Sequence, residues 1–91
     1  MNVKIHSSVI EELRTYPKSV QESLFNHFSA LIDPENIEGD IGPFIGNGTV
    51  QRWYIDKKFF VLIKLDKKDD EVRVIALMTI AQAVDTYGRY Y

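Results

Sequence analysis

Hydrophobic residues recur along the chain with two different periods, and the change from one period to the other falls near Thr49. Val3 and Ile5 alternate with polar neighbours, which is typical of a short strand with one buried face. Two helical stripes follow, formed by Val9, Ile10, Leu13 and Tyr16 and then by Val20, Leu24, Phe28, Leu31 and Ile32. The pattern therefore predicts a strand followed by a helical hairpin over residues 8 to 32.

Three local signals set the expected ends of these two helices. Ser8 followed by Glu11 fits a capping box, in which each side chain satisfies the other residue's backbone N–H at a helix start. Pro17 is tolerated in a first helical turn but not inside a helix, so we expect the two helices to meet there. The pair Asp33-Pro34 predicts the end of the second helix.

Residues 33 to 48 contain four glycines, two prolines and four acidic residues, and we expect a long ordered loop there. The apolar residues that would attach this loop to the core are Ile37, Ile41, Phe44 and Ile45. The glycine spacing matches no phosphate-binding motif that opens a helix, so turn formation explains the glycines better.

After Thr49 the chain becomes rich in β-branched and aromatic residues, which predicts three sequential antiparallel strands. Their sequences are VQRWYI, KFFVLIKL and EVRVIALMTI, and short polar turns at Asp56-Lys57 and at residues 66 to 70 separate them. The apolar run from Phe59 to Leu65 predicts a central strand, and a weak helical pattern begins at Ala81. The predicted fold class is α+β, with the order β-α-α-β-β-β in one domain over residues 1 to 91.

The amino-acid composition excludes several kinds of functional site. The chain has no cysteine, which excludes disulfides, thiolate nucleophiles and cysteine-bound zinc. Residues 1 to 45 hold three Lys/Arg against seven Asp/Glu, whereas residues 46 to 91 hold eight against six. The net charge is −2, and the resulting pI near 5.6 argues against a protein whose main task is to grip bare nucleic acid, but leaves room for a local basic patch. No signal peptide or membrane span is recognisable, so we expect a cytoplasmic protein.

Cationic residues provide the first candidate site. On a strand over residues 50 to 56, Val50, Arg52 and Tyr54 share one face. Lys64 and Arg73 would lie near Arg52 if the neighbouring strands present them on the same side. Such a cluster could hold an RNA or DNA backbone or neutralise charge at a scissile phosphate. The alternative is that these side chains only solvate an exposed face.

The carboxyl-terminal segment provides the second candidate site. Tyr87, Tyr90 and Tyr91 surround Arg89, and such residues can stack on bases and pair with phosphate. Packing or an interface is the alternative explanation. His6 and His27 lack metal-ligand spacing and a nucleophile motif, and the acidic residues from Asp66 to Glu71 lack the alternation of a calcium loop. We therefore expect no metal and no cofactor.

The chain resembles the RelE/ParE superfamily of toxins from bacterial type II toxin–antitoxin systems. The segment GPFIGNGTVQRWYIDKKFFVLIKL resembles the family's loop, arginine-bearing strand, tight turn and apolar strand, and EVRVIALMTIAQAVDTY resembles the last strand and tail. The resemblance implies a toxin that a cognate antitoxin neutralises. In the ribosome-dependent RNases of the family, it further implies metal-independent mRNA cleavage with Arg52 and Tyr87 as catalytic residues and Lys64, Arg73 and Arg89 as RNA-binding residues.

The sequence also departs from the family pattern. Lys58, Phe59 and Phe60 stand where family members commonly have arginine, and Thr79 to Gln82 replace a usual basic cluster. These departures and the acidic pI favour the alternative of a non-catalytic binding module, either a gyrase inhibitor or a protein-interaction domain. An unrelated small α+β interaction protein is the third alternative.

Overall fold

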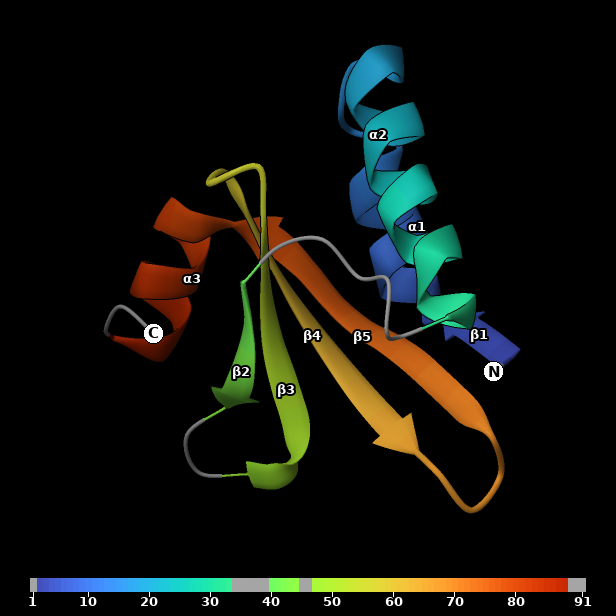
Figure 1. The fold of residues 1–91 in the computed structure, drawn as a ribbon. Coiled ribbons are helices and arrows are strands. Elements are labelled where there is room, and N and C mark those ends of the chain that lie inside the picture. The colour runs from blue at the N-terminus through green and yellow to red at the C-terminus, as the bar shows by residue number, and fades with distance from the viewer. Residues whose placement is uncertain (1, 34–39, 45–46, 89–91) are drawn as a thin grey trace.

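The computed structural model describes residues 2–33, 40–44 and 47–88, and in this part the chain forms one five-stranded sheet flanked by helices (Figure 1). The strand order is β1-β5-β4-β3-β2. The strands are β1 (Asn2–Ile5), β2 (Asp40–Phe44), β3 (Asn47–Ile55), β4 (Phe59–Asp66) and β5 (Glu71–Thr79). The strand β1 runs parallel to β5, and the other neighbouring pairs are antiparallel. The predicted α+β class with a mainly antiparallel sheet is confirmed.

Two helices, α1 (Ser7–Leu13) and α2 (Lys18–Ser29), follow β1 and form the predicted hairpin. Pro17 is the residue immediately before α2, so the two helices do meet there. A short 3-10 turn, Ala30–Ile32, extends α2, and Asp33 ends it. The helical region therefore matches the expected residues 8 to 32 closely.

The start of α1 differs from the prediction. The capping residue is His6 rather than Ser8, and its Nδ1 atom accepts the backbone N–H of Ser8 at 3.1 Å. The backbone carbonyl of His6 also accepts from Val9 and Ile10. The predicted capping box of Ser8 and Glu11 is therefore wrong, because the imidazole of His6 supplies the acceptor two residues before Ser8.

The predicted loop over residues 33 to 48 is also partly wrong, because residues 40–44 form β2. This strand pairs antiparallel with β3 at the edge of the sheet, with Gly42 opposite Arg52. Pro43 lies in an edge strand, which is where a sheet tolerates proline. Ile41 packs against the main core as expected, whereas Ile37 and Ile45 and the side chain of Phe44 lie outside the described part of the structure.

The three predicted sequential strands are confirmed as β3, β4 and β5, with β4 in the centre of the sheet. Asp56, Lys57 and Lys58 connect β3 to β4, and the first two have positive φ angles of 54° and 56°. Two consecutive residues with positive φ are typical of the tightest hairpin turn, whose twist suits the flanking strands. This turn fixes the register of β3 on β4, with Arg52 opposite Leu62.

The main core lies between the helical hairpin and one face of the sheet, at the right in Figure 1. Trp53 is fully buried there, and its ring lies edge-on to His27 and tilted against Phe28. The core residues are Val9, Leu13, Leu24, Phe28, Leu31, Trp53, Ile55, Phe59, Val61, Ile63, Val72, Val74 and Leu77. This burial explains why α1 and α2 stay on the sheet without strong helix propensity of their own.

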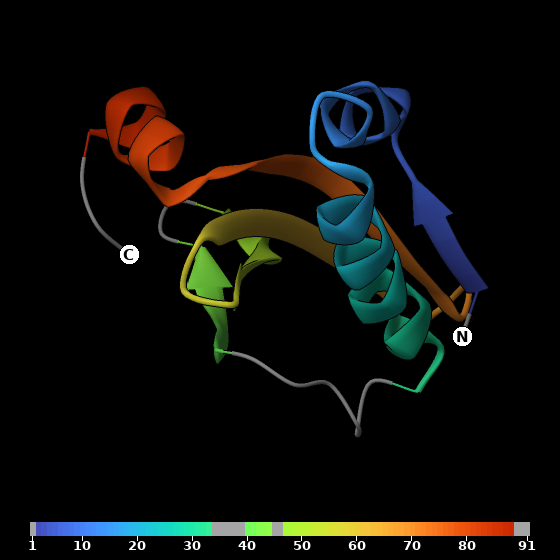
Figure 2. The same cartoon turned by 90° about the horizontal axis from the view of Figure 1, so that it is seen from above.

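A third helix, α3 (Ile80–Tyr87), lies away from the α1–α2 pair, with the strands between them (Figures 1 and 2). Thr79 and Gln82 form a capping box at its start, and Gly88, with a φ of 76°, ends it. The helical pattern that the sequence shows from Ala81 therefore corresponds to a helix in the structure. It packs on a second apolar cluster that contains Val50, Phe60, Leu62 and Ala83.

Candidate functional site

Arg52 lies on the sheet face opposite the α1–α2 hairpin. Its neighbours in β3, Trp53 and Ile55, point into the main core, whereas Val50 and Tyr54 belong to the cluster under α3. Because side chains alternate along a strand, Arg52 shares the face of Val50 and Tyr54. The prediction that Val50, Arg52 and Tyr54 share one face of this strand is confirmed.

The Arg52 side chain is held closely by its surroundings. Its guanidinium carbon lies 5.0 Å from the centre of the Tyr54 ring, a cation–π geometry. The Nη1 atom is buried. On the neighbouring strand β2, a Cβ atom built on Gly42 would come within 2.9 Å of Nη2, so only glycine lets the guanidinium lie there undisturbed. The cation is thus fixed between an aromatic ring and the backbone of β2.

Tyr87, on the last turn of α3, reaches the same face. Its ring centre is 5.6 Å from that of Phe60, and Phe60 is 5.6 Å from Tyr54. A continuous row of contacts therefore connects Arg52 to Tyr54, Phe60 and Tyr87. Sequence reasoning missed the roles of Gly42, Tyr54 and Phe60 in this row, because they follow from the register of β2, β3 and β4, which no single segment specifies.

Lys64 and Arg73 are directly opposite each other on β4 and β5, and Lys64 is also opposite Val50. Both therefore share the face of Arg52. Lys64 lies on the neighbouring strand β4, two residues along from Leu62, which is opposite Arg52. The expectation that neighbouring strands present these cations on one side is met. Arg89, Tyr90 and Tyr91 lie outside the described residues.

Glu71 is a buried acidic residue on the same sheet face as Lys64 and Arg73. Its Oε1 atom lies 2.9 Å from Lys4 Nζ, and its Oε2 atom accepts a 2.6 Å hydrogen bond from Arg73 Nε. Hydrogen bonds from Lys4 and Arg73 hold the pKa of the Glu71 carboxyl below its usual range. Arg73 is thus both an exposed cation and the partner of a buried carboxylate.

The histidines have local structural contacts. His6 caps α1, and His27 Nδ1 donates to the backbone carbonyl of Ser23 at 2.7 Å. Within residues 2–33, 40–44 and 47–88, no three histidine, aspartate or glutamate side chains gather as a metal site would require. The same part of the chain has no helix long and apolar enough to cross a membrane.

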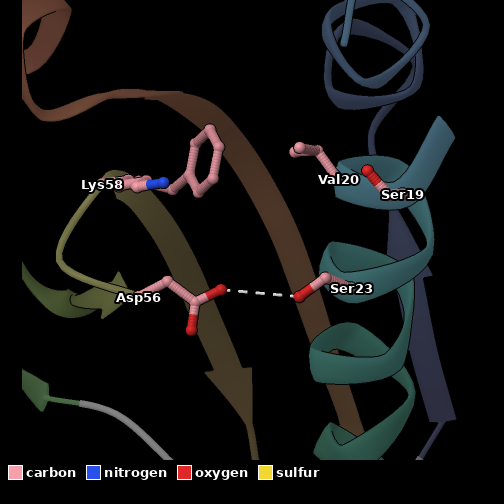
Figure 3. A pocket seen from close by; sticks show the side chains of 6 residues that line it. Ser19, Val20, Ser23, Asp56 and Lys58 are labelled. Atoms are coloured by element: carbon pink, nitrogen blue, oxygen red, sulfur yellow. Dashed lines mark hydrogen bonds between the residues drawn. The ribbon is translucent and has the colours of Figure 1, made fainter. Parts of the chain in front are cut away.

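A separate hollow of about 330 Å³ lies on the opposite side, between α2 and the β3–β4 turn (Figure 3). Ser23 and Asp56 approach each other across it, with their oxygens 3.5 Å apart, and Val20 and Phe59 form its apolar wall. This contact connects the tight turn of the hairpin to α2. Its residues lie on the helix side of the sheet and are no part of the Arg52 face.

Comparison with known proteins places this geometry in a fold family. No protein-family model matches the sequence, and no curated protein matches it either. Among solved structures, the RelE–RelB complex of Pyrococcus horikoshii is similar, with a TM-score of 0.70, 23% identity, and coverage of 86% of this chain and 92% of that one.

Two further solved structures agree with it. The RelB–RelE antitoxin–toxin complex of Methanococcus jannaschii gives a TM-score of 0.73 at 12% identity, covering 92% of this chain and 98% of that one. The isolated E. coli RelE toxin gives 0.65 at 14% identity, covering 94% and 97%. The element order and sheet described above are therefore those of RelE along nearly the whole chain. This chain has the fold of the RelE toxins, and the predicted resemblance is confirmed at the level of the fold.

Proposed function

We propose that this chain is the toxin of a type II toxin–antitoxin pair and acts in the cytoplasm. The fold supports this proposal, because the similar structures include toxins solved together with their RelB antitoxins. These matches extend over at least 92% of each of those two toxin chains. On this proposal, the protein partner is a cognate antitoxin that binds the chain and blocks its active face.

The proposed activity is ribosome-dependent cleavage of mRNA. The observation that carries it is the row from Arg52 through Tyr54 and Phe60 to Tyr87 on the face opposite α1 and α2. A guanidinium fixed in this way can stabilise negative charge that develops on a scissile phosphate, since its orientation needs no change during the reaction. Lys64 and Arg73 supply further positive charge on the same face.

In the proposed reaction, the ribose 2′-oxygen attacks the neighbouring phosphorus and the bond from phosphorus to the 5′-oxygen breaks. The 2′-hydroxyl loses its proton, and the 5′-oxygen gains one as it leaves. The Tyr87 hydroxyl is the proposed group for one of these proton transfers. This chemistry uses the RNA's own hydroxyl as nucleophile and needs no metal ion or cofactor.

One observation favours a second candidate function, a non-catalytic binding module such as a gyrase inhibitor. Glu71 pairs with both Lys4 and Arg73, so part of the positive charge on this face is balanced within the protein. A phosphate site with fewer uncompensated cations would bind RNA more weakly. A surface of this kind would suit contacts with a protein partner instead.

Expression of the chain alone in bacteria tests the toxin proposal. We expect growth arrest that co-expression of the antitoxin relieves, and normal growth with abundant folded protein would refute the proposal. Purified protein then separates the two candidates: cleavage of mRNA on programmed ribosomes supports the RNase, whereas inhibition of gyrase supercoiling without cleavage supports the binding module. Arg52→Ala should abolish cleavage, and Arg14→Ala, an exposed arginine on the helix side, is the matched control.

A further inference from the structure

The hollow between α2 and the β3–β4 turn combines apolar and charged walls (Figure 3). The residues that line it are Ser19, Val20, Ser23, Asp56, Lys58 and Phe59. Its volume of about 330 Å³ lies within the range of about 300 to 1,000 Å³ that is usual for small-molecule pockets. Phe59 belongs to the main core and its ring packs against that of Tyr16, so the apolar wall is held in place.

The two charged lining residues, Asp56 and Lys58, stand on a turn whose backbone is fixed. The Lys58 N–H donates to the Ile55 carbonyl at 3.0 Å, and the Lys58 carbonyl accepts the N–H of Ile80, the first residue of α3, at 3.0 Å. Asp56 has a φ of 54°, a conformation that aspartate adopts more readily than most residues. A ligand that binds both side chains therefore has little backbone to order, which lowers the entropic cost of binding.

The Asp56 carboxylate has only a weak partner across the hollow. Ser23 Oγ donates to Asp56 Oδ2, but the two oxygens are 3.5 Å apart. A hydroxyl that donates to a carboxylate normally lies about 2.5 to 2.7 Å from it. An ammonium group in the hollow can donate to the carboxylate and to Ser23 Oγ together, and so replace this weak contact with two stronger ones.

Lys58 brings the opposite charge to the same hollow. Within residues 2–33, 40–44 and 47–88, Asp56 and Lys58 form no ion pair, either with each other or with another residue. Both residues are exposed, so solvent reaches the two charged groups. The hollow therefore presents one carboxylate and one ammonium group beside an apolar wall.

The charges around the hollow give no net preference for an anion or a cation. The charged residues adjacent in sequence to the lining are Lys18, Glu22 and Lys57. Glu12 lies behind the apolar wall, because it accepts from the Tyr16 hydroxyl and the Tyr16 ring is 5.3 Å from that of Phe59. Two cations and two carboxylates thus flank Asp56 and Lys58, and this balance favours a ligand that carries both charges.

We propose that this hollow binds a free α-amino acid with an apolar side chain, in its zwitterionic form. The ammonium group of the ligand donates to Asp56 and Ser23, its carboxylate accepts from Lys58, and its side chain packs on Val20 and Phe59. The site lies on the helix side of the sheet, away from the Arg52 face. The inference therefore does not rest on the proposed function and needs neither RNA nor an antitoxin.

A chemical-shift titration of the ¹⁵N-labelled full chain with L-leucine at neutral pH tests the site. We expect saturable shifts of the lining residues with a Kd of about 1 mM, which suits a small ligand held by a few contacts. Two probes each lack one charged group of leucine: 4-methylpentanoate has no amino group, and 3-methylbutylamine has no carboxylate. Each should bind at least about fivefold more weakly than leucine, because it loses one charge-assisted contact.

Two variants assign the contacts. Asp56→Asn removes the charge, keeps the shape and tolerates the positive φ. It should weaken leucine binding at least about fivefold and should not weaken binding of 4-methylpentanoate, which has no ammonium group to lose. Lys58→Met should likewise weaken leucine binding but not that of 3-methylbutylamine. Asp85→Asn and Lys67→Met, at exposed positions outside the lining, are the matched controls and should leave every Kd unchanged.

Three results would overturn the proposal. The first is the absence of shifts in the lining residues at about 10 mM leucine, some ten times the expected Kd. The second is equal affinity for leucine and 4-methylpentanoate, which would make the hollow a purely apolar or anionic-ligand site. The third is equal affinity for leucine and 3-methylbutylamine, as expected of a hollow that takes a cationic side chain of a protein partner. If circular dichroism shows that a variant is unfolded, the three probes on the wild type decide alone.

Discussion

The guanidinium carbon of Arg52 lies 5.0 Å from the centre of the Tyr54 ring, two residues further along the same strand. Alternation along β3 puts both side chains on one face, and the ring therefore serves as a platform for the cation. Such a contact stabilises by about 0.5 to 2 kcal/mol, depending on how far the pair is desolvated. Its main effect here is to restrict where the positive charge can lie.

Replacing Arg52 with lysine tests whether that restricted position matters. Lysine keeps the charge but loses the planar guanidinium that stacks on Tyr54. We expect Arg52→Lys to reduce the rate of ribosome-dependent mRNA cleavage by about 10²-fold, comparable to the loss of one oxyanion donor. Cleavage close to the wild-type rate would show that only charge at this position is needed.

Gly42 provides an independent test of the same geometry without touching Arg52. A methyl group at this position would come 2.9 Å from Nη2, so the guanidinium must move. Since the clash is with the end of a flexible side chain, we expect Gly42→Ala to change the free energy of unfolding by less than about 1 kcal/mol. Cleavage should nevertheless fall at least tenfold, measured beside a thermal unfolding curve of the same preparation.

Tyr87 has two separable contributions, its ring and its hydroxyl. Tyr87→Phe keeps the ring against Phe60, so we expect wild-type stability together with a large loss of cleavage. Tyr87→Ala removes the ring as well and should destabilise the protein by about 1 to 2 kcal/mol, since the side chain is only half-buried. Equal cleavage by the wild type and Tyr87→Phe would assign the tyrosine a packing role alone.

Most of the fold could be predicted because local patterns and the final structure agree. Each of these local patterns favours a single kind of structure: the stripes favour helices, the apolar run of β4 favours a buried strand, and Asp56-Lys57 favours a turn. The errors occur where long-range pairing decides the outcome. Residues 40–44 contain Gly42 and Pro43, which argue against a strand locally, and only the exposed edge of β3 makes them one.

The candidate site was predictable only in part, for the same reason. Alternation along one strand placed Arg52 and Tyr54 on a common face, and that required no knowledge of neighbouring strands. The row through Phe60 to Tyr87 depends on strand register and on α3 folding back over the sheet. The pairing of Glu71 with Lys4 joins opposite ends of the sequence, so no local pattern could predict it.

The β3–β4 turn offers a stability prediction that leaves the proposed active face untouched. Lys57 is exposed and has a φ of 56°, a conformation that disfavours a side chain with a Cβ atom. Lys57→Gly should therefore raise the free energy of unfolding by about 1 kcal/mol, measured by urea denaturation. Lys67→Gly, at an exposed position in the β4–β5 connection whose own φ is not positive, is the control and should not stabilise.

The contacts of Glu71 predict how stability depends on pH. Hydrogen bonds from Lys4 and Arg73 lower the pKa of Glu71 in the folded protein, so the unfolded chain takes up this proton first as the pH falls. The resulting stabilisation is fully present above the ordinary glutamate pKa of about 4.3 and is lost as the pH falls through the lower folded value. Glu71→Gln should therefore unfold at a lower temperature than the wild type at pH 7, with the difference shrinking below about pH 4. Thermal unfolding at several pH values between 7 and about 4 measures this difference in unfolding temperature. Glu22→Gln, at an exposed position of α2, is the control. A difference that stays constant with pH would mean that the carboxylate charge contributes nothing to holding β1 on β5.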